Sequence, residues 1–529
     1  MAINLRQAQG SRANVASLPA PVGGWNARDS IANMEPTDAV QLDNLFPTVS
    51  SCVLRGGYSK LATVSGTVRS LFNYSGGATE RLFAVAGSSI YRVDTGTAVA
   101  QTLPTSLTSA ICEYTNISTT GGNFMFVVNG TDIPLLYDGT DWKNPGTGFA
   151  PSITFPATPA GMSTSKFSNI TLFKNRLWFI EKNTLRAWYL PTLSIGGAAQ
   201  YIDLSSIAKF GGHLVDLDTW TVDAGYGVDD NLAFVTSNGE VIVYRGTDPA
   251  SAATWALAGV WKLGSPIGTR AMLKYGGDLL VLTYDGLMPM AQSLQSSRLD
   301  PRVALSNKIQ GAIAEATSTY GSHTSTGWQI FYSAKNNAVW INVPVQDNLQ
   351  EQYVMNTITT SWCKFKGWGA YCWETYNDNP YFGGDGFVAQ AWTDDYADNG
   401  LAITTVAKQA FNYFDSRGVK KYFTRARPTI MSSGTPAINL GLNIDFETST
   451  SVSPIGLAVQ PASGLWGPGV GAGIWDESIW GGAVSVSNNW QGITGIGYCA
   501  SLIFTTASTQ ISIEWPSTDV VFQSGWAGI

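Results

Sequence analysis

Residues 175–191 read NRLWFIEKNTLRAWYLP, an apolar run, a short polar turn and a second apolar run containing Trp-Tyr. This pattern predicts two antiparallel strands joined by a tight turn. In the copy at residues 230–246 the turn is Asn238-Gly239, a dipeptide that two-residue hairpin turns favour. The pattern recurs at residues 81–96, 122–142, 175–191, 230–246, 277–291, 328–344 and, more weakly, 379–394.

The spacing of these hairpins distinguishes two all-β architectures. Their starts recur roughly every 40–55 residues, which is the spacing of the four-stranded blades of a β-propeller. A large β-sandwich is the alternative, but the shared form of the copies favours the propeller. We therefore expect an all-β fold with a propeller of about six or seven blades, in which each hairpin supplies the inner strands of a blade.

The two ends of the chain differ from the hairpin region. Residues 402–433 predict two long strands, and the last thirty residues or so predict a final hairpin. Helical periodicity is scarce, with one or two turns expected over residues 35–47 and a helix over 303–316. We expect an N-terminal arm and interface segment over 1–60, a propeller over 61–398 and a C-terminal β-domain over 399–529. The arm and the C-terminal region together would form an additional β-rich platform or tube wall.

Composition excludes several classes of protein. The 529 residues are 44% hydrophobic and 12% aromatic, which indicates a folded chain. Only 13% are charged, and the net charge of −7 disfavours a protein that grips DNA along a basic face. The sequence has no apolar run of 18 residues and no signal-peptide pattern, so we expect synthesis in a cytoplasm and no membrane span.

Residues that usually carry catalysis or metal binding are sparse. The chain has two histidines, His213 and His323, and no phosphate-binding loop, nucleophile elbow or zinc-protease motif. We therefore predict no catalytic residues, no metal site and no cofactor. The five cysteines have no CxxC spacing, which favours reduced core thiols, with a Cys363–Cys372 pair as the alternative.

Three charged or aromatic clusters keep more than one interpretation. The aspartates can be a glycosidase acid–base pair, calcium ligands or ordinary turn residues. The basic run, in which Lys421, Arg425 and Arg427 share one strand face with Phe423, can hold DNA, line a subunit interface or face solvent. The tryptophans can stack on sugars or bases, or fix loops and interfaces. The clusters are Asp216, Asp218, Asp223, Asp229 and Asp230 with Asp394, Asp395 and Asp398; Arg417, Lys420, Lys421, Arg425 and Arg427; and Trp475, Trp480 and Trp490.

The N-terminal stretch PVGGWNARDSIANMEPTDAVQLDNLFPTVSSCVLRGGY, residues 21–58, combines turn residues with regularly placed apolar ones. It is too irregular to form its own core and too apolar to remain in water. We therefore expect the rest of the chain, or another copy of it, to cover these apolar residues, and an interface between copies is the hypothesis we favour. They are Trp25, Leu42, Leu45, Phe46 and Leu54.

This stretch resembles the N-termini of the tail nozzle, or tail tubular, proteins of short-tailed bacteriophages. The first 60 residues carry the specific part of the likeness, although NRLWFIEKNTLRAWY and the RARPTI strand are also similar. The matching elements are Gly23-Gly24-Trp25-Asn26, Arg28-Asp29-Ser30, Met34, Pro36, Asp38-Ala39-Val40, Leu42-Asp43-Asn44, Phe46-Pro47 and Leu54-Arg55-Gly56-Gly57-Tyr58.

The resemblance implies a structural, non-enzymatic virion protein. It implies a homohexameric ring below the portal and its adaptor, the head-to-tail connector. The ring would extend the DNA-ejection channel, retain and release the genome, and dock fibres or a needle. Double-stranded DNA would pass without sequence-specific binding, and contact with the host envelope is a further expectation. The interface residues we expect are Trp25, Asn26, Arg28, Asp29, Leu45, Phe46, Arg425 and Arg427.

Two rival functions stay open at this point. A carbohydrate-binding or glycoside-cleaving propeller, such as a receptor-binding tail protein, would use the tryptophans and the loop carboxylates. A DNA-binding factor would use the basic run between residues 417 and 427.

Overall fold

The computed structural model describes residues 13–77, 80–223, 228–293, 301–321, 327–346, 349–447, 452–454 and 485–525. The chain divides into two compact units. The propeller unit is Tyr58–Tyr353 with Gly367–Trp392. The two-sheet unit is Met1–Gly57, Val354–Lys366 and Thr393–Ile529, so the N-terminal arm and the C-terminal region belong together. The expected boundaries were at 60 and 398, and the return of the chain to the two-sheet unit over Val354–Lys366 was not expected from the sequence.

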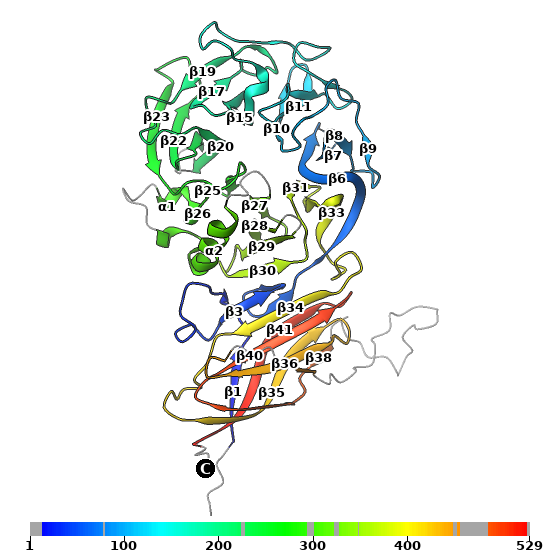
Figure 1. Ribbon diagram of the computed structural model, residues 1–529, viewed down its shortest axis with the longest axis vertical. Helices are drawn as coiled ribbons and strands as arrows, with labels where there is room; N and C mark the ends of the chain where they lie inside the picture. Colours follow the sequence, from blue (N-terminus) through cyan, green and yellow to red (C-terminus); the bar gives the residue numbers. More distant parts are fainter. Residues whose placement is uncertain are drawn as a thin grey trace, which may run out of the picture. The chain divides into compact units, whose positions relative to one another are not determined.

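In the described residues, the propeller unit is a ring of seven antiparallel blades, and the all-β propeller prediction is confirmed (Figure 1). The blades are, in order: β6 (Gly57–Ser75), β7 (Glu80–Ala86), β8 (Ser89–Arg92), β9 (Val99–Ala100); β10 (Glu113–Thr119), β11 (Gly122–Val128), β12 (Leu135–Tyr137), β13 (Trp142–Lys143); β15 (Phe167–Phe173), β16 (Arg176–Glu181), β17 (Arg186–Tyr189), β19 (Gln200–Asp203); β20 (Leu214–Asp223), β21 (Val228–Thr236), β22 (Glu240–Gly246), β23 (Trp255–Lys262); β24 (Met272–Tyr275), β25 (Asp278–Thr283), β26 (Gly286–Pro289); β27 (Gln329–Ser333), β28 (Ala338–Gln346), β29 (Leu349–Asn356); and β31 (Cys372–Tyr376), β32 (Asn379–Gly383), β33 (Asp385–Thr393).

One long strand closes the ring. Strand β6 pairs through Val68–Ser75 with β7 of blade one, and it also pairs with β33, the last strand of blade seven. The first and last parts of the propeller sequence therefore share a sheet, which removes the free edges that an open ring would expose.

The seven predicted hairpins are present, but they are not the strands nearest the axis. In six blades they form the second and third strands, and only β27–β28 of blade six begins its sheet. In these six blades the first strand, such as β10, β15 or β20, lies innermost, and it comes from the stretches between the recognised hairpins (Figure 1).

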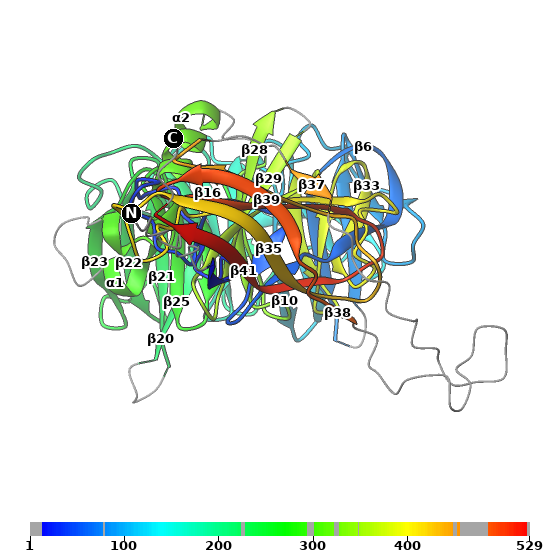
Figure 2. The ribbon, with the colours of Figure 1, turned by 90° about the horizontal axis from the view of Figure 1, so that it is seen from below.

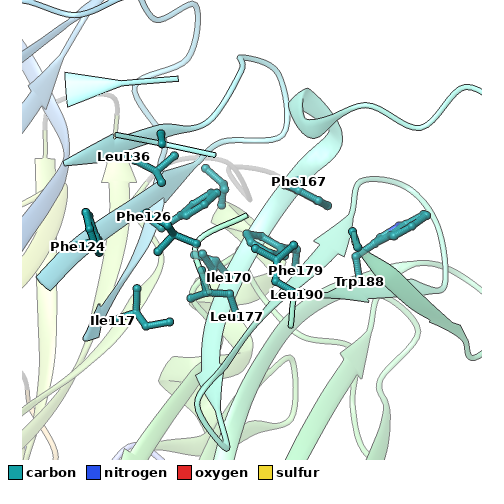
Figure 3. Packing of buried hydrophobic residues seen from close by; sticks show 14 residues of the cluster. Ile117, Phe124, Phe126, Leu136, Phe167, Ile170, Leu177, Phe179, Trp188 and Leu190 are labelled. Carbon is teal, nitrogen blue, oxygen red and sulfur yellow. The ribbon is translucent and has the colours of Figure 1, made fainter. Parts of the chain in front are cut away.

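Neighbouring blades pack face to face through apolar side chains. Figure 3 shows this core between blades two and three, where Phe126 of β11 faces Phe179 of β16. The ring centroids of these two residues are 5.2 Å apart, and those of Phe167 and Phe179 are 4.2 Å apart. Because each blade is covered on both faces, its middle strands are continuous apolar runs, which is why the sequence reveals them.

The two-sheet unit is also built of strands. One sheet holds β1 (Ala13–Pro19), β4 (Leu45–Pro47), β5 (Cys52–Leu54), β35 (Lys421–Ser432), β38 (Ser485–Ser487), β39 (Gln491–Gly497) and β41 (Ile513–Ser524), and Figure 2 shows the long β35 and β41 side by side. The other holds β2 (Gly24–Trp25), β3 (Asp38–Asp43), β30 (Trp362–Lys366), β34 (Ile403–Gln409), β36 (Ile438–Ile444), β37 (Ser453–Pro454) and β40 (Ala500–Ser508).

Two local predictions in this unit are wrong. Residues 35–47 form β3 and β4 rather than a helix, because Leu42 pairs with Ala407 of β34 in an antiparallel ladder. The expected final hairpin does not form either, since β40 and β41 lie in different sheets. The two sheets meet through stacked rings, with the Phe504 and Trp515 centroids 4.7 Å apart.

Helix is rare among the described residues. The short elements are η1 (Thr164–Lys166), α1 (Met290–Ser293), η2 (Pro301–Val303), η3 (Asn307–Ile309) and α2 (Gln310–Tyr320), and β14 (Ile153–Thr154) pairs in parallel with β18 (Gly197–Ala198). The helix expected over 303–316 corresponds to η3 and α2, shifted toward the C-terminus. None of the helices in the described ranges is long and apolar enough to cross a membrane.

The packing between blades two and three predicts a large effect of one ring. Phe179→Ala should lower the free energy of unfolding by about 3–5 kcal/mol, because it removes a fully buried ring that contacts two other rings. Urea unfolding followed by Trp fluorescence measures this. Leu257→Ala, at a side chain that is 44% exposed on β23, is the control and should change stability little. Equal effects of the two substitutions would contradict this packing.

Candidate functional site

The apolar residues of the N-terminal stretch are buried by their own chain. Trp25 is 8% exposed, Leu45 0% and Phe46 6%. The Lys364 ammonium lies 4.8 Å from the centroid of the Trp25 ring, and the rings of Phe46 and Phe365 are 6.3 Å apart. The prediction that a second copy buries these side chains is therefore wrong, because β30 and the C-terminal strands of the same chain already cover them.

Asn26 shapes the turn that follows Trp25. Its side-chain amide donates to Asp38 at 2.7 Å and to Asp29 at 2.9 Å, and its oxygen accepts the backbone N–H groups of Arg28 and Asp29 at 3.0 Å each. Gly23 is required beside it, since a Cβ there would lie 2.4 Å from an Asp38 oxygen. Asn26 is thus buried as well, and it is not available to a partner.

Arg28 and Asp29 remain on the surface. They form a two-pronged ion pair with N···O distances of 2.8 and 2.9 Å, and their side chains are 43% and 36% exposed. The hydrogen bond to Asp29 raises the pKa of Arg28. Of the expected interface residues in this segment, these two can still meet a partner.

Arg55 belongs to the phage-like motif, but it was not among the site residues expected from the sequence. It is fully buried, and all five of its N–H groups have acceptors. It pairs with both oxygens of Asp398 at 2.8 and 2.6 Å, and it donates to the Asn44 side chain at 2.9 Å. The carbonyls of Gly56 and Lys366 accept at 2.9 and 2.6 Å. Arg55 thereby joins all three segments of the two-sheet unit.

Position 57, next to the contacts of Arg55 (the Arg55 clamp), requires a glycine for a steric reason. A Cβ at Gly57 would approach the Ala397 carbonyl oxygen to 1.9 Å, so the backbones of β6 and the segment before Asp398 lie closer than any side chain permits. The Leu54-Arg55-Gly56-Gly57 part of the phage-like motif therefore specifies a tight crossing of two backbones.

The basic run does not share one strand face. A bulge between Phe423 and Arg425 shifts the register of β35, so Lys421 and Phe423 point inward while Arg425 and Arg427 point outward. The Lys421 ammonium is buried against the carbonyls of Ser416, Val419 and Tyr498, and burial lowers its pKa.

Most of the other cations of the run contact a carboxylate or an aromatic ring. Arg427 pairs with Asp519 at 2.6 Å and lies 4.6 Å from the Trp490 ring centroid, whereas Arg425 is exposed. Arg417 and Lys420 lie over the rings of Tyr413 and Tyr498. Arg417, Lys420 and Arg425 are all exposed, and Arg425 differs from the other two in that it does not lie over an aromatic ring.

The remaining candidate residues from the sequence do not form a common site in the described residues. Asp394 and Asp395 are exposed, and Asp230 pairs with Lys174 at 2.5 Å. Within the described ranges, no three His, Cys, Asp or Glu side chains are grouped to hold a metal. The five cysteines are free and buried, and His213 is partly buried. His323, Trp475, Trp480 and the side chains of Asp223 and Asp229 lie outside the described residues.

A polar cavity of about 390 Å³ lies among the first strands of the propeller blades. Asp216 and Asp218 of β20 line it together with three groups that the sequence analysis did not single out: Glu113 of β10, Arg270 before β24 and Glu374 of β31. The only sequence signal for these groups was the position of polar residues between the recognised hairpins.

Asp216 braces three blades from inside this cavity. Its Oδ1 accepts from the Asn169 side chain of β15 and from the backbone N–H of Leu217, both at 2.8 Å. Its Oδ2 accepts the backbone N–H groups of Ala271 and Met272 at 3.1 and 3.0 Å. Burial, reinforced by the charges of Asp218 and Glu113, raises the pKa of Asp216 well above its ordinary value. With four donors around it, this carboxyl serves structure.

The other carboxyls of the cavity differ in their partners. Asp218 pairs with Lys274 at 3.0 Å, and Glu113 pairs with Arg270 at 2.9 Å. Glu374 accepts the N–H of Thr375 at 2.9 Å and shares a hydrogen bond with Tyr114. Burial raises the pKa of Glu374 to about 7, so it changes charge near neutral pH.

No protein-family model and no curated protein sequence matches the chain. Among solved structures it is similar to YCF48 from Cyanidioschyzon merolae, at 12% identity over 63% of this chain and 98% of that one, with a TM-score of 0.37. It is also similar to BBS1N in complex with ARL6DN, at 10% identity over 64% and 98% of the two chains, with a TM-score of 0.35. It is similar as well to dihydro-heme d1 dehydrogenase NirN in complex with DHE, at 12% identity over 62% of this chain and 61% of that one, with a TM-score of 0.33. At these values the likenesses carry no argument about function.

The buried contacts of Arg55 predict that its removal destabilises the protein far more than removal of the exposed Arg28. Arg55→Met should lower the free energy of unfolding of the two-sheet unit by roughly 3–5 kcal/mol, because it leaves the Asp398 carboxylate buried without its partner. Arg28→Met, which removes an exposed ion pair, should cost less than about 1 kcal/mol. Urea unfolding and hydrogen exchange of β3 and β34 measure the difference. Matching losses in the two variants would refute the clamp.

Glu374 predicts a pH dependence of stability. Its pKa is raised on folding, so the protonated form favours the folded state, and this contribution is lost as pH rises from the unfolded value of 4.5 through about 7. Glu374→Gln, which mimics the protonated form, should lose less stability than the wild type between about pH 5 and about pH 8. Melting temperatures across this range test it. Glu315→Gln, at an exposed position on α2, should follow the wild-type curve; a steeper loss in Glu374→Gln would reverse the sign and exclude the explanation.

Proposed function

We propose that this chain is a structural subunit of a short bacteriophage tail, where it forms the nozzle ring below the portal and its adaptor. The ring extends the DNA-ejection channel, retains and releases the genome, and docks fibres or a needle. Its partners are further copies of the chain in a homohexamer, the adaptor, the fibre or needle, and double-stranded DNA that passes without sequence-specific binding. Contact with the host envelope and residence in the virion tail belong to the same proposal.

The observation that carries this proposal is the phage-like N-terminal segment, whose polar residues form hydrogen bonds within the two-sheet unit. Asn26, Asn44 and Arg55 bond to neighbouring main chain and side chains inside the two-sheet unit. Gly23 and Gly57 permit close backbone approach. A motif whose buried polar groups are engaged in this way specifies a framework, which suits a protein that acts by assembly.

The electrostatics support the same function. The net charge of −7 favours a surface that does not hold DNA. The cations of the basic run are buried or packed against aromatic rings, apart from Arg425. Arg425, together with the Arg28–Asp29 pair, is therefore the part of the expected interface that remains for contacts with neighbouring subunits.

Assembly tests the proposal directly. The purified chain should form rings when mixed with the adaptor ring of the same phage, as seen by native mass spectrometry and negative-stain images. Arg425→Glu should weaken ring formation by about tenfold or more, because it reverses an exposed interface charge. Lys209→Glu, an equal charge change on an exposed residue of the propeller unit, is the matched control. A chain that stays monomeric on the adaptor and is absent from purified particles would exclude the nozzle function.

A glycoside-cleaving propeller is the second candidate, because several carboxyls share the cavity. Cleavage needs an acid and a second, available carboxylate. Glu374, with its pKa of about 7, fits the acid, but Asp218 and Glu113 are paired with cations and Asp216 accepts four hydrogen bonds. A reducing-sugar assay on host envelope polysaccharide decides: release of sugar that Glu374→Gln abolishes would support this candidate over the nozzle.

A further inference from the structure

The position of Arg270 in the ring is unusual for a residue at the start of a blade. It precedes β24 of blade five, and its acceptors lie on β6 of blade one and β10 of blade two or directly before them. In a ring of seven, blades one and two are each three steps from blade five by the shorter way. Figure 1 shows β6 to β11 across the ring from β25 and β26. The Arg270 side chain therefore spans the axis of the propeller.

The far end of this side chain is held by four acceptors. Its Nε donates to Glu113 at 2.9 Å, and Nη2 donates to the Ser70 hydroxyl at 2.8 Å and to the Cys112 carbonyl at 2.9 Å. A longer contact of 3.4 Å joins Nη1 to the Arg69 carbonyl. The planar guanidinium is suited to such a set, because it presents several donors in a fixed geometry.

The backbone around Arg270 is also held by other blades. The backbone N–H groups of Ala271 and Met272 donate to Asp216, and Asp216 in turn accepts from Asn169 of blade three. Arg270 also bridges to Gln329 of blade six, whose side chain bonds to the backbone of Trp373 in blade seven. Side chains of blades one, two, three, four and six and the backbone of blade seven thus help to fix the Arg270 side chain across the channel.

We propose that Arg270 is a crossbar that closes the central channel of the propeller at the level of Cys112 and Ser70. The closed channel admits small molecules to the polar cavity only from the other mouth, and the crossbar locks opposite blades together in addition to the closure of the ring by strand β6. The proposal concerns the propeller unit alone and does not depend on the nozzle function.

Two native thiols report on this closure. Cys112 is 1% exposed and contributes to the cavity lining, and Cys372 is fully buried. Burial raises the pKa of both thiols to about 12, and the Arg270 charge acts on both in the opposite direction, which places them near the crossbar. Cys52, Cys363 and Cys499 lie in the two-sheet unit and serve as internal references.

The test is alkylation of the native, full-length chain by iodoacetamide, with each cysteine quantified by peptide mass spectrometry. Arg270→Met should raise the alkylation rate of Cys112 by about tenfold or more, while the three reference cysteines keep their rates. The lost charge by itself lowers the thiolate fraction, so a faster reaction reports access and not a lower pKa. An unchanged rate at Cys112 would overturn the proposal.

Two further variants keep the test decisive if Arg270→Met unfolds. Arg186→Met removes an arginine whose pair, with Glu181, lies within blade three, and it should leave Cys112 protected. Glu113→Gln removes the carboxylate charge that pairs with the crossbar, while the Gln amide oxygen, Ser70 and the Cys112 carbonyl can still accept, and it should raise the Cys112 rate by a smaller factor than Arg270→Met. If Arg270→Met exposes all five thiols alike and Glu113→Gln exposes none, Arg270 only stabilises the fold and the crossbar is refuted.

Discussion

The two-sheet unit depends on one fully buried cation. Arg55 lies near the end of the first segment of this unit, and its guanidinium contacts Lys366 of the second segment and Asp398 of the third. The propeller sequence separates these segments, but the entropy of closing a loop rises only slowly with its length, so such an insertion is tolerated. A buried guanidinium that lacks acceptors is strongly unfavourable, and therefore each segment needs the other two.

The sequence indicates the propeller well because of how blades are covered. The middle strands, such as β16 and β21, carry continuous buried apolar runs, Leu177–Ile180 and Leu232–Val235, since neighbouring blades pack on both faces. The innermost strands mix polar and apolar residues, because one side lines the channel and their polar groups bond to other blades. Such partners lie far away in sequence, so no local pattern identifies Glu113 or Arg270 as paired residues.

The two-sheet unit was harder to predict for a related reason. Residues 35–47 have a helical spacing of apolar residues, yet the ladder with β34 determines their conformation. The bulge after Phe423 reverses which side chains of β35 face outward, and a strict alternation cannot anticipate it. The apolar side chains of the N-terminal stretch were correctly predicted to need a cover, but sequence alone does not distinguish the same chain from a second copy.

A chain with only 13% charged residues uses several of them inside. Arg55, Arg270 and Lys421 each gather acceptors from separate stretches of chain, and Asp216 does the same with donors. An apolar contact tolerates imperfect packing, whereas a buried charge requires all of its partners at once. These few charges therefore fix which strands meet, while the apolar runs supply most of the stabilisation. Because only 13% of the residues are charged, exposed charges are sparse, and an exposed cation such as Arg425 can influence which partner binds.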